Sequence, residues 1–434
     1  MKLLIKKITC VILILCSYCS YGEAKIQLPS ILGNGMVLQQ KSEVKLWGKA
    51  TPNKKVVVYT SWNAQQQEVD SNQKGDWSVA VTTPEAGGPY TIRISDGEEL
   101  ILDDVLIGEV WLCSGQSNME MPVKGFRGQP VFGSQPYIVS ANPKRPLRLY
   151  TVKNAWSTIP QEAGVDGEWK EASPEDVADF SATAYFFGNQ LQQSLDVPVG
   201  LIHCSWSMSK IEAWMNKETL SGFPEIALPD VAQKEFGWTA GTPTLLWNAM
   251  VNPWKGFPVK GVIWYQGEAN TPDPGLYKRL FSAMVSQWRT FFNNPQMPFY
   301  YVQIAPWKSE GNDKQDWAWF RQCQLELMSE VPNVGMVTTG DAGSENFIHR
   351  YRHTLTPKQR EGSQRIGIRM CRRTLPGIFQ LFNYQLHIRH QIRHLHDFGH
   401  FCNFFFFIHN TLIFISALNV LPANSYTKQK VYEC

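Results

Sequence analysis

The sequence predicts an α/β protein, in which a mostly parallel sheet is covered by helices on both faces and follows a β-rich N-terminal region. From about residue 106, strand-like runs alternate with stretches of helical periodicity, as expected for β-α-β units. These strand-like runs are almost continuously apolar, which is typical of parallel strands buried on both faces. Residues 25–105 contain only strand-like runs and turn residues.

The N-terminal residues predict export. Three lysines precede the short apolar run ITCVILILC, and the sequence GEA then supplies small residues for cleavage. Residues 1–24 are therefore predicted to be a signal peptide, and the mature chain is expected in the periplasm or outside the cell. The apolar run is too short for a permanent membrane helix, so no stable membrane anchor is expected.

Residues 25–105 are predicted to form a β-rich accessory domain. The runs KVVVYTSW, DWSVAVTT and PYTIRISD are separated by turn material such as NQKGD and PEAGGP. This spacing favours a β-sandwich-like arrangement. The region has no obvious catalytic constellation, so its expected role is structural.

Residues 106–370 are predicted to form the catalytic α/β domain. The expected strands are VLIGEVWLC, VGLIHCSW, KGVIWYQ, PFYYVQIAP and VGMVTTGD, and the expected helices are ATAYFFGNQLQQSL, PGLYKRLFSAMVSQWRTFFN and DWAWFRQCQLELMSEV. Four strands are followed by polar clusters: SGQSN, SWSMSK, QGEAN and GDAGSENFIH. Carboxyl ends of parallel strands meet at one edge of a sheet. A ligand crevice is therefore expected there.

Five of these segments together resemble the sialate O-acetylesterase family of the SGNH hydrolase superfamily: GQSNMEMP, WSMSKIEAWM, WYQGEAN, YYVQIAP and TTGDAGSENFIH. The similarity spans roughly residues 26–349. It implies a three-layer SGNH-hydrolase-like fold. It also implies an exported carbohydrate O-acetylesterase that hydrolyses O-acetyl esters on sugars, through a serine nucleophile and a histidine base.

The resemblance assigns the nucleophile and the base. Ser117 matches the serine of GQSNM, and Ser114 is the competing serine, with a turn role as its alternative. His349 matches the histidine that follows the last strand. Ester cleavage needs such a pair, because a serine hydroxyl is a weak nucleophile until a base removes its proton.

The acid that orients the histidine is left open by the sequence. Asp341 matches an acid commonly found at this strand end in the family, and Glu345 is the alternative. Asn346 stands where many superfamily relatives have aspartate. A serine–histidine pair oriented by a backbone carbonyl is a third possibility.

The oxyanion and substrate contacts are predicted from three motifs. The family commonly has W-G-G where this chain has Trp206-Ser207-Met208, and a backbone angle that only glycine adopts would not survive that change. Backbone N–H groups and side-chain amides are suitable donors. The predicted contributors are Ser117, Ser207, Gln266, Gly267 and Asn270.

The predicted partner is an acetylated sugar or glycan, and no cofactor, metal or nucleic acid is expected. There is no glycine-rich phosphate motif, and the six cysteines after the signal peptide have no metal-binding spacing. The 16 tryptophans suit either a sugar-binding surface or a core. Two alternatives to an esterase are a non-catalytic carbohydrate-binding protein and an inactive, truncated relative.

Residues 371–434 are predicted to be an atypical, poorly ordered tail. After residue 349 the chain has nine Arg and three Lys against three acidic residues, together with seven of its nine histidines. The run FCNFFFFIHNTLIFISALNV excludes a solvated basic arm and leaves a membrane helix at 401–421 as an alternative. The simplest hypothesis is a shifted reading frame shortly after His349, which would leave an impaired enzyme.

Overall fold

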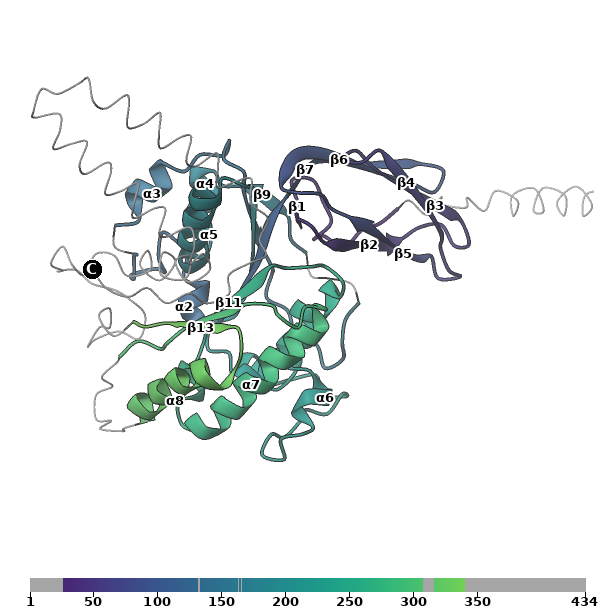
Figure 1. Ribbon diagram of the computed structural model, residues 1–434. Coiled ribbons are helices and arrows are strands. Elements are labelled where there is room, and N and C mark those ends of the chain that lie inside the picture. The colour runs from purple at the N-terminus through teal and green to yellow at the C-terminus, as the bar shows by residue number, and fades with distance from the viewer. Residues whose placement is uncertain (1–25, 132, 163, 165, 307–315, 340–434) are drawn as a thin grey trace, which may run out of the picture. The chain divides into compact units, whose positions relative to one another are not determined.

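The structure is a computed structural model that describes residues 26–339, except residues 132, 163, 165 and 307–315. It confirms a mixed α/β fold with a mostly parallel sheet of order β13-β12-β11-β7-β10-β8, with β9 antiparallel at the β8 edge (Figure 1). The strands are β7 (Glu99–Gly115), β8 (Leu147–Thr151), β9 (Trp169–Glu171), β10 (Val199–Ser205), β11 (Gly261–Tyr265), β12 (Phe299–Val302) and β13 (Val334–Val337).

Helices cover both faces of this sheet, with α5 on one face and α7 and α8 on the other (Figure 1). Trp111 of β7 contacts Phe187 of α5, whereas Trp264 of β11 contacts Trp288 of α7. The helices are α2 (Ser117–Glu120), α3 (Gln135–Val139), α4 (Pro174–Asp179), α5 (Ala182–Leu195), α6 (Lys217–Leu220), α7 (Pro274–Phe291) and α8 (Asp316–Glu330). Short helical turns lie at Ile211–Trp214, Thr239–Gly241, Trp247–Val251, Asn252–Trp254 and Glu268–Asn270.

Local sequence explains where the two long central helices begin. The Ser181 hydroxyl accepts the backbone N–H of Ala184 at the start of α5 (3.2 Å), and the Asp273 carboxylate accepts the N–H of Leu276 in α7 (2.9 Å). Both are N-cap interactions, which satisfy N–H groups that have no partner inside the helix. The apolar residues of α7 then recur at helical spacing and are buried: Tyr277, Leu280, Phe281, Met284, Val285 and Trp288.

The N-terminal region is built from two sets of strands. Strands β4, β3, β6 and the first half of β7 form an antiparallel sheet, β1 runs parallel to β7, and β2 pairs with β5. The strands are β1 (Val37–Gln39), β2 (Glu43–Lys49), β3 (Lys55–Thr60), β4 (Gln65–Asp70), β5 (Asp76–Thr82) and β6 (Gly87–Ser95). The strand content is as predicted, and a closed sandwich stays a prediction.

The boundary predicted between residues 105 and 106 falls inside β7, which runs without a break through both regions. The reason is visible in the sequence ELILDDVLIGEVWLCSG, in which no Pro or Gly cluster interrupts the strand. Further contacts join the regions. The Trp169 indole N–H donates to the Ile31 carbonyl (2.8 Å), and the hydroxyls of Ser30 and Tyr150 are 2.6 Å apart.

Several tryptophans belong to the core. Trp111, Trp214, Trp247, Trp254, Trp264 and Trp288 are among the largest fully buried side chains. In the described part of the chain, no helix is both long and apolar enough to cross a membrane. The predicted signal peptide, the predicted tail with its candidate membrane helix, Asp341 and His349 all lie outside the described residues.

Candidate active site

Ser117 lies directly beyond the carboxyl end of β7, the strand at the centre of the parallel sheet. Gly115 makes the exit from the strand possible. Its φ is 142°, and a Cβ there would lie 2.1 Å from the carbonyl oxygen of Tyr265 in β11, so only glycine fits. The Gln116 N–H donates to that same carbonyl (2.9 Å). Ser117 then becomes the first residue of the short helix α2.

The two candidate serines differ in accessibility. Ser114 lies within β7 between β10 and β11, has no exposed surface, and its hydroxyl has no partner among the described residues. Ser117 retains 6% of its surface. Since a dissolved ester can reach only an accessible hydroxyl, the placement favours Ser117.

The residues on either side of Ser117 are both bound to the loop that follows β11. The Gln116 side-chain oxygen accepts the backbone N–H groups of Gly267 (3.2 Å) and Ala269 (3.4 Å). The Asn118 amide donates to Glu268 Oε1 (2.8 Å), and both side chains are buried. We refer to these three hydrogen bonds as the serine clamp. The clamp fixes the backbone on both sides of Ser117.

The side-chain amides of the third motif are bonded inside the protein. Gln266 is fully buried, and its Nε2 donates to the Ser209 carbonyl (3.0 Å) and to Asn270 Oδ1 (2.8 Å). Asn270 Nδ2 donates to Glu212 Oε2 (2.8 Å). Both amide hydrogens of Gln266 are therefore occupied, whereas Asn270 keeps one. Gly267 approaches Ile304 and Phe320 so closely that a Cβ would lie 2.6 Å from each.

The second motif follows β10 and is joined to β7. The Trp206 N–H (3.1 Å) and the Ser209 hydroxyl (3.2 Å) both donate to the carbonyl of Gly115. Met208 has a φ of 60° and its side chain is 65% exposed. The left-handed backbone angle anticipated for this motif therefore occurs at Met208 and not at Ser207.

Two backbone N–H groups of the candidate site have no hydrogen-bond partner among the described residues. Within the described part of the chain, no hydrogen bond uses the N–H of Ser117 or that of Ser207. Ser117 and Ser207 each lie two residues beyond the end of a strand. The two strands end side by side, because Ser205 of β10 is in register with Gly115 of β7. Unbonded N–H groups at such a position are suited to a negatively charged oxygen.

Glu268 is a buried carboxyl group with one partner. Its Oε1 accepts from Asn118, and its Oε2 has no partner among the described residues. Burial raises the pKa of Glu268 to about 7, although the Asn118 hydrogen bond opposes this. The group therefore changes its charge close to neutral pH.

A buried serine–histidine pair on β10 was missed by sequence reasoning. His203 Nε2 and Ser205 Oγ are 2.6 Å apart on β10, and both side chains are buried. Burial lowers the pKa of His203 to about 4, so the ring is neutral at physiological pH. The signal was the alternation in HCS, which places residues two apart on the same face of a strand.

The predicted acid and base are not among the described residues. Asp341, its alternative Glu345, and His349 follow β13, whose carboxyl end lies at the same edge of the sheet as that of β7. The last described residue, Thr339, is fully buried and its hydroxyl donates to the Gln303 carbonyl (2.9 Å). Among the described residues, no group of three or more His, Cys, Asp or Glu side chains could hold a metal ion.

Comparison with known families places the chain in a class of carbohydrate esterases. Residues 107–366 match the family model described as carbohydrate esterase, sialic acid-specific acetylesterase. The chain belongs to this family. The matched range contains Ser117, Asp341 and His349.

Individual relatives agree. The chain is 30% identical over 337 residues to the sialate O-acetylesterase of Homo sapiens, covering 71% of this chain and 63% of the human protein. Identity to the Rattus norvegicus sialate O-acetylesterase is 28% over 362 residues. The structure is similar to that of a carbohydrate acetylesterase from Xanthomonas citri, with a TM-score of 0.70, 34% identity, and coverage of 82% of this chain and 76% of that one.

Proposed function

We propose that the chain is an exported carbohydrate O-acetylesterase, with Ser117 as its nucleophile and His349 as its base. The observation that supports this most directly is the position of Ser117. It combines a carboxyl-edge location, residual exposure and a clamp on both neighbouring residues. A nucleophile held in this way loses little freedom when it attacks.

The chemistry follows from these roles. Ser117 Oγ adds to the acetyl carbonyl carbon while its proton passes to His349. The bond from that carbon to the sugar oxygen then breaks, and the sugar oxygen takes the proton from His349. Water repeats both steps on the acetylated serine and releases acetate. The N–H groups of Ser117 and Ser207 would stabilise the oxyanion, together with the remaining N–H of Asn270, and Asp341 or Glu345 would orient His349.

The test is hydrolysis by the chain expressed without residues 1–24. We expect turnover of 4-nitrophenyl acetate and of members of a panel of O-acetylated sugars that includes O-acetylated sialic acid. Ser117→Ala should abolish turnover and Ser114→Ala should retain it. Labelling with a fluorophosphonate, followed by peptide mapping, should identify Ser117; modification of Ser114 instead would contradict the assignment.

The same preparation tests the expectation that the chain is an impaired copy. The change in composition after residue 349 predicts low solubility, because the run FFFF is an aggregation hazard when exposed. A soluble chain with a cooperative thermal transition and full esterase activity would contradict that expectation.

A further inference from the structure

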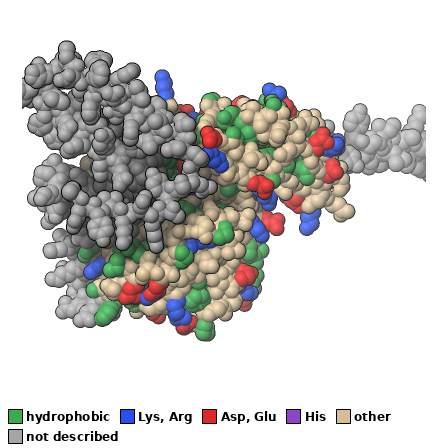
Figure 2. Space-filling model, viewed as in Figure 1, with side chains coloured by type: hydrophobic (Ala, Val, Ile, Leu, Met, Phe, Trp, Pro, Cys, Tyr) green, Lys and Arg blue, Asp and Glu red, His purple; other side chains and the backbone are tan. Residues whose placement is uncertain are grey.

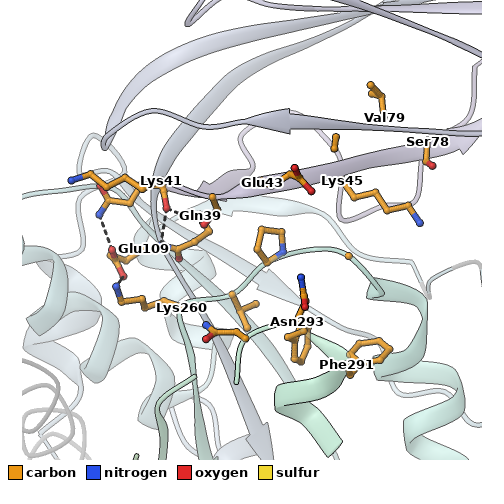
Figure 3. A pocket seen from close by; sticks show the side chains of 18 residues that line it. Gln39, Lys41, Glu43, Lys45, Ser78, Val79, Glu109, Lys260, Phe291 and Asn293 are labelled. Atoms are coloured by element: carbon orange, nitrogen blue, oxygen red, sulfur yellow. Dashed lines mark hydrogen bonds and ion pairs between the residues drawn. The ribbon is translucent and has the colours of Figure 1, made fainter. Parts of the chain in front are cut away.

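A long groove lies along the outer face of the β2–β5 pair. Two cavities, of about 1070 Å³ and 830 Å³, meet at Lys45 and Ser78, which line both. The opposite wall is formed by residues 252–260 and by the carboxyl end of α7, where Phe291 and Asn293 lie across from Ser78 and Lys45 (Figure 3). We call this the β2–β5 groove. It is larger than a site for one small molecule requires.

The floor of the groove carries an aromatic ring among small side chains. Alternation along β2 buries Val44 and Leu46 and leaves Lys45 and Trp47 half-buried on the groove side. Trp47 is in register with the exposed Ser78, and Lys45 with the exposed Ala80. Trp47 packs partly against the hydrophobic core, and the rest of its side chain lines the groove beside Ser78. The Lys45 ammonium lies 5.5 Å from the ring centroid of Trp47.

Polar groups line both ends of the groove. Asp70, Asn72 and Asp76 lie at one end, and Gln40, Asn293 and Asn294 at the other. Carboxylates and amides of this kind accept and donate hydrogen bonds to hydroxyl groups, while a flat indole suits the C–H face of a sugar ring. The combination matches a carbohydrate better than a wholly apolar ligand.

The charges in the groove exclude a polyanion as the preferred ligand. Six acidic side chains and five lysines line the two cavities. Lys49 pairs with Asp76, and Lys260 lies 3.6 Å from Glu109. In the view of Figure 2, acidic and basic side chains are likewise interspersed on the described surface. Nucleic acids and sulfated glycans require an excess of cations.

The groove is separate from the candidate active site. It reaches β7 at Glu109, whereas Ser117 follows the end of this strand at Gly115. Six residues of extended strand correspond to about 20 Å. A ligand in the groove therefore leaves Ser117 accessible.

We propose that the β2–β5 groove binds a neutral oligosaccharide chain, with a sugar ring against Trp47 and its hydroxyls on the neighbouring amides and carboxylates. The choice of a carbohydrate rests on the proposed function, and the groove would tether the enzyme to the polymer that carries its acetyl groups.

The test is affinity electrophoresis of the full chain in native gels that contain arabinoxylan, galactomannan or heparin. We expect at least one of the two neutral polysaccharides to retard the protein, and Trp47→Ala to weaken that retardation at least tenfold. Ser78→Arg, which fills the groove from the exposed face of β5, should do the same. Trp62→Ala is the matched control, since Trp62 is half-buried against Tyr90 outside the groove.

Two further measurements separate this proposal from the proposed function. Ser117→Ala should still be retarded, and Trp47→Ala should keep its turnover of 4-nitrophenyl acetate. Retardation without any esterase activity would contradict the proposed function and support the groove proposal. Absence of retardation by both neutral polysaccharides, retardation by heparin alone, or full retardation of Trp47→Ala would each overturn the groove proposal.

Discussion

Glu268 links the stability of the protein to pH at the scale of a single residue. Its pKa is about 7 in the folded chain because of burial, against an ordinary value of 4.5. A carboxyl group with a raised pKa stabilises the fold at low pH, and this contribution is lost as the pH rises through 7. Glu268→Gln keeps an acceptor for Asn118 and removes the ionisation. When the pH is raised from 5.5 to 8, the free energy of unfolding of the variant relative to that of the wild type should therefore increase by about 2 kcal/mol.

Urea unfolding at these two pH values measures this difference. Glu85→Gln is the control, because the exposed Lys41–Glu85 pair lowers the pKa of Glu85 and so confines its titration to acidic pH. Its effect on stability should be the same at pH 5.5 and pH 8. An effect of Glu268→Gln that is the same at both pH values would show that folding does not raise the pKa of Glu268.

Met208 has a strained backbone conformation, and its exposed side chain makes little packing contact to offset the strain. It adopts a φ of 60° while 65% exposed. The left-handed conformation costs about 1–2 kcal/mol for a non-glycine residue. Glycine avoids this cost but loses more chain entropy on folding, which destabilises the fold by about 0.5–1 kcal/mol. Met208→Gly should thus raise the free energy of unfolding by roughly 0.5–1 kcal/mol. Met208→Ala keeps the strain, and equal stability of the two variants would refute the explanation.

At the scale of the strand end, Gly115 determines how β7 leaves the sheet. An alanine there meets both an unfavourable φ and the Tyr265 carbonyl at 2.1 Å. Gly97, in the turn between β6 and β7, has a similar φ of 126° but nothing within 4 Å. Gly97→Ala should cost about 1–3 kcal/mol from backbone strain alone, and Gly115→Ala roughly 4 kcal/mol or more. Thermal unfolding of both variants measures these losses of stability. Equal losses would exclude the clash with the Tyr265 carbonyl as a cause.

The serine clamp should control the rate of acyl transfer. Asn118→Ala removes the bond to Glu268 and frees the first turn of α2. Small displacements of a reacting group can cost up to about 100-fold in rate, so kcat should fall about 10- to 100-fold with KM unchanged. Asn118→Asp places a second carboxyl beside Glu268, and its rate relative to the wild type should be lower at pH 8 than at pH 5.5. A higher KM with normal kcat would contradict a positioning role.

The elements that the sequence predicted are those with a strong apolar pattern. ATAYFFGNQLQQSL and VGLIHCSW lie on α5 and β10 because a buried helix or strand must carry apolar residues at its own period. Strand β4, with the sequence QQQEVD, was missed since its side chains are mostly exposed and only its pairing with β3 fixes it.

The candidate site was predictable to the same degree. The polar clusters after apolar strands predicted a crevice at the sheet edge, and the resemblance of GQSNM to the family was needed to select Ser117. The clamp was not predictable, because Asn118 and Glu268 are 150 positions apart in the chain and meet only when β7 and β11 pair. The occupied amides of Gln266 were hidden for the same reason.

At the scale of the whole molecule, the continuity of β7 predicts that the β-rich and α/β regions unfold together. The strand contributes to both sheets, and the buried Arg148 donates to Asp104 across the junction (2.7 Å). Separate unfolding would expose Trp169 and Tyr150, whose partners Ile31 and Ser30 lie in the β-rich region. All 16 tryptophans precede residue 320, and three of them, Trp47, Trp62 and Trp77, lie in the β-rich region.

Tryptophan fluorescence therefore reports on both regions, and no tryptophan after residue 339 contributes to the signal. We expect its urea transition to coincide with that of far-ultraviolet circular dichroism, as for a single cooperative unit. Arg148→Met should shift both transitions together, because removing the buried cation affects strands on either side of the junction. Two separated transitions, with Arg148→Met moving only one of them, would show that the long strand does not couple the two regions.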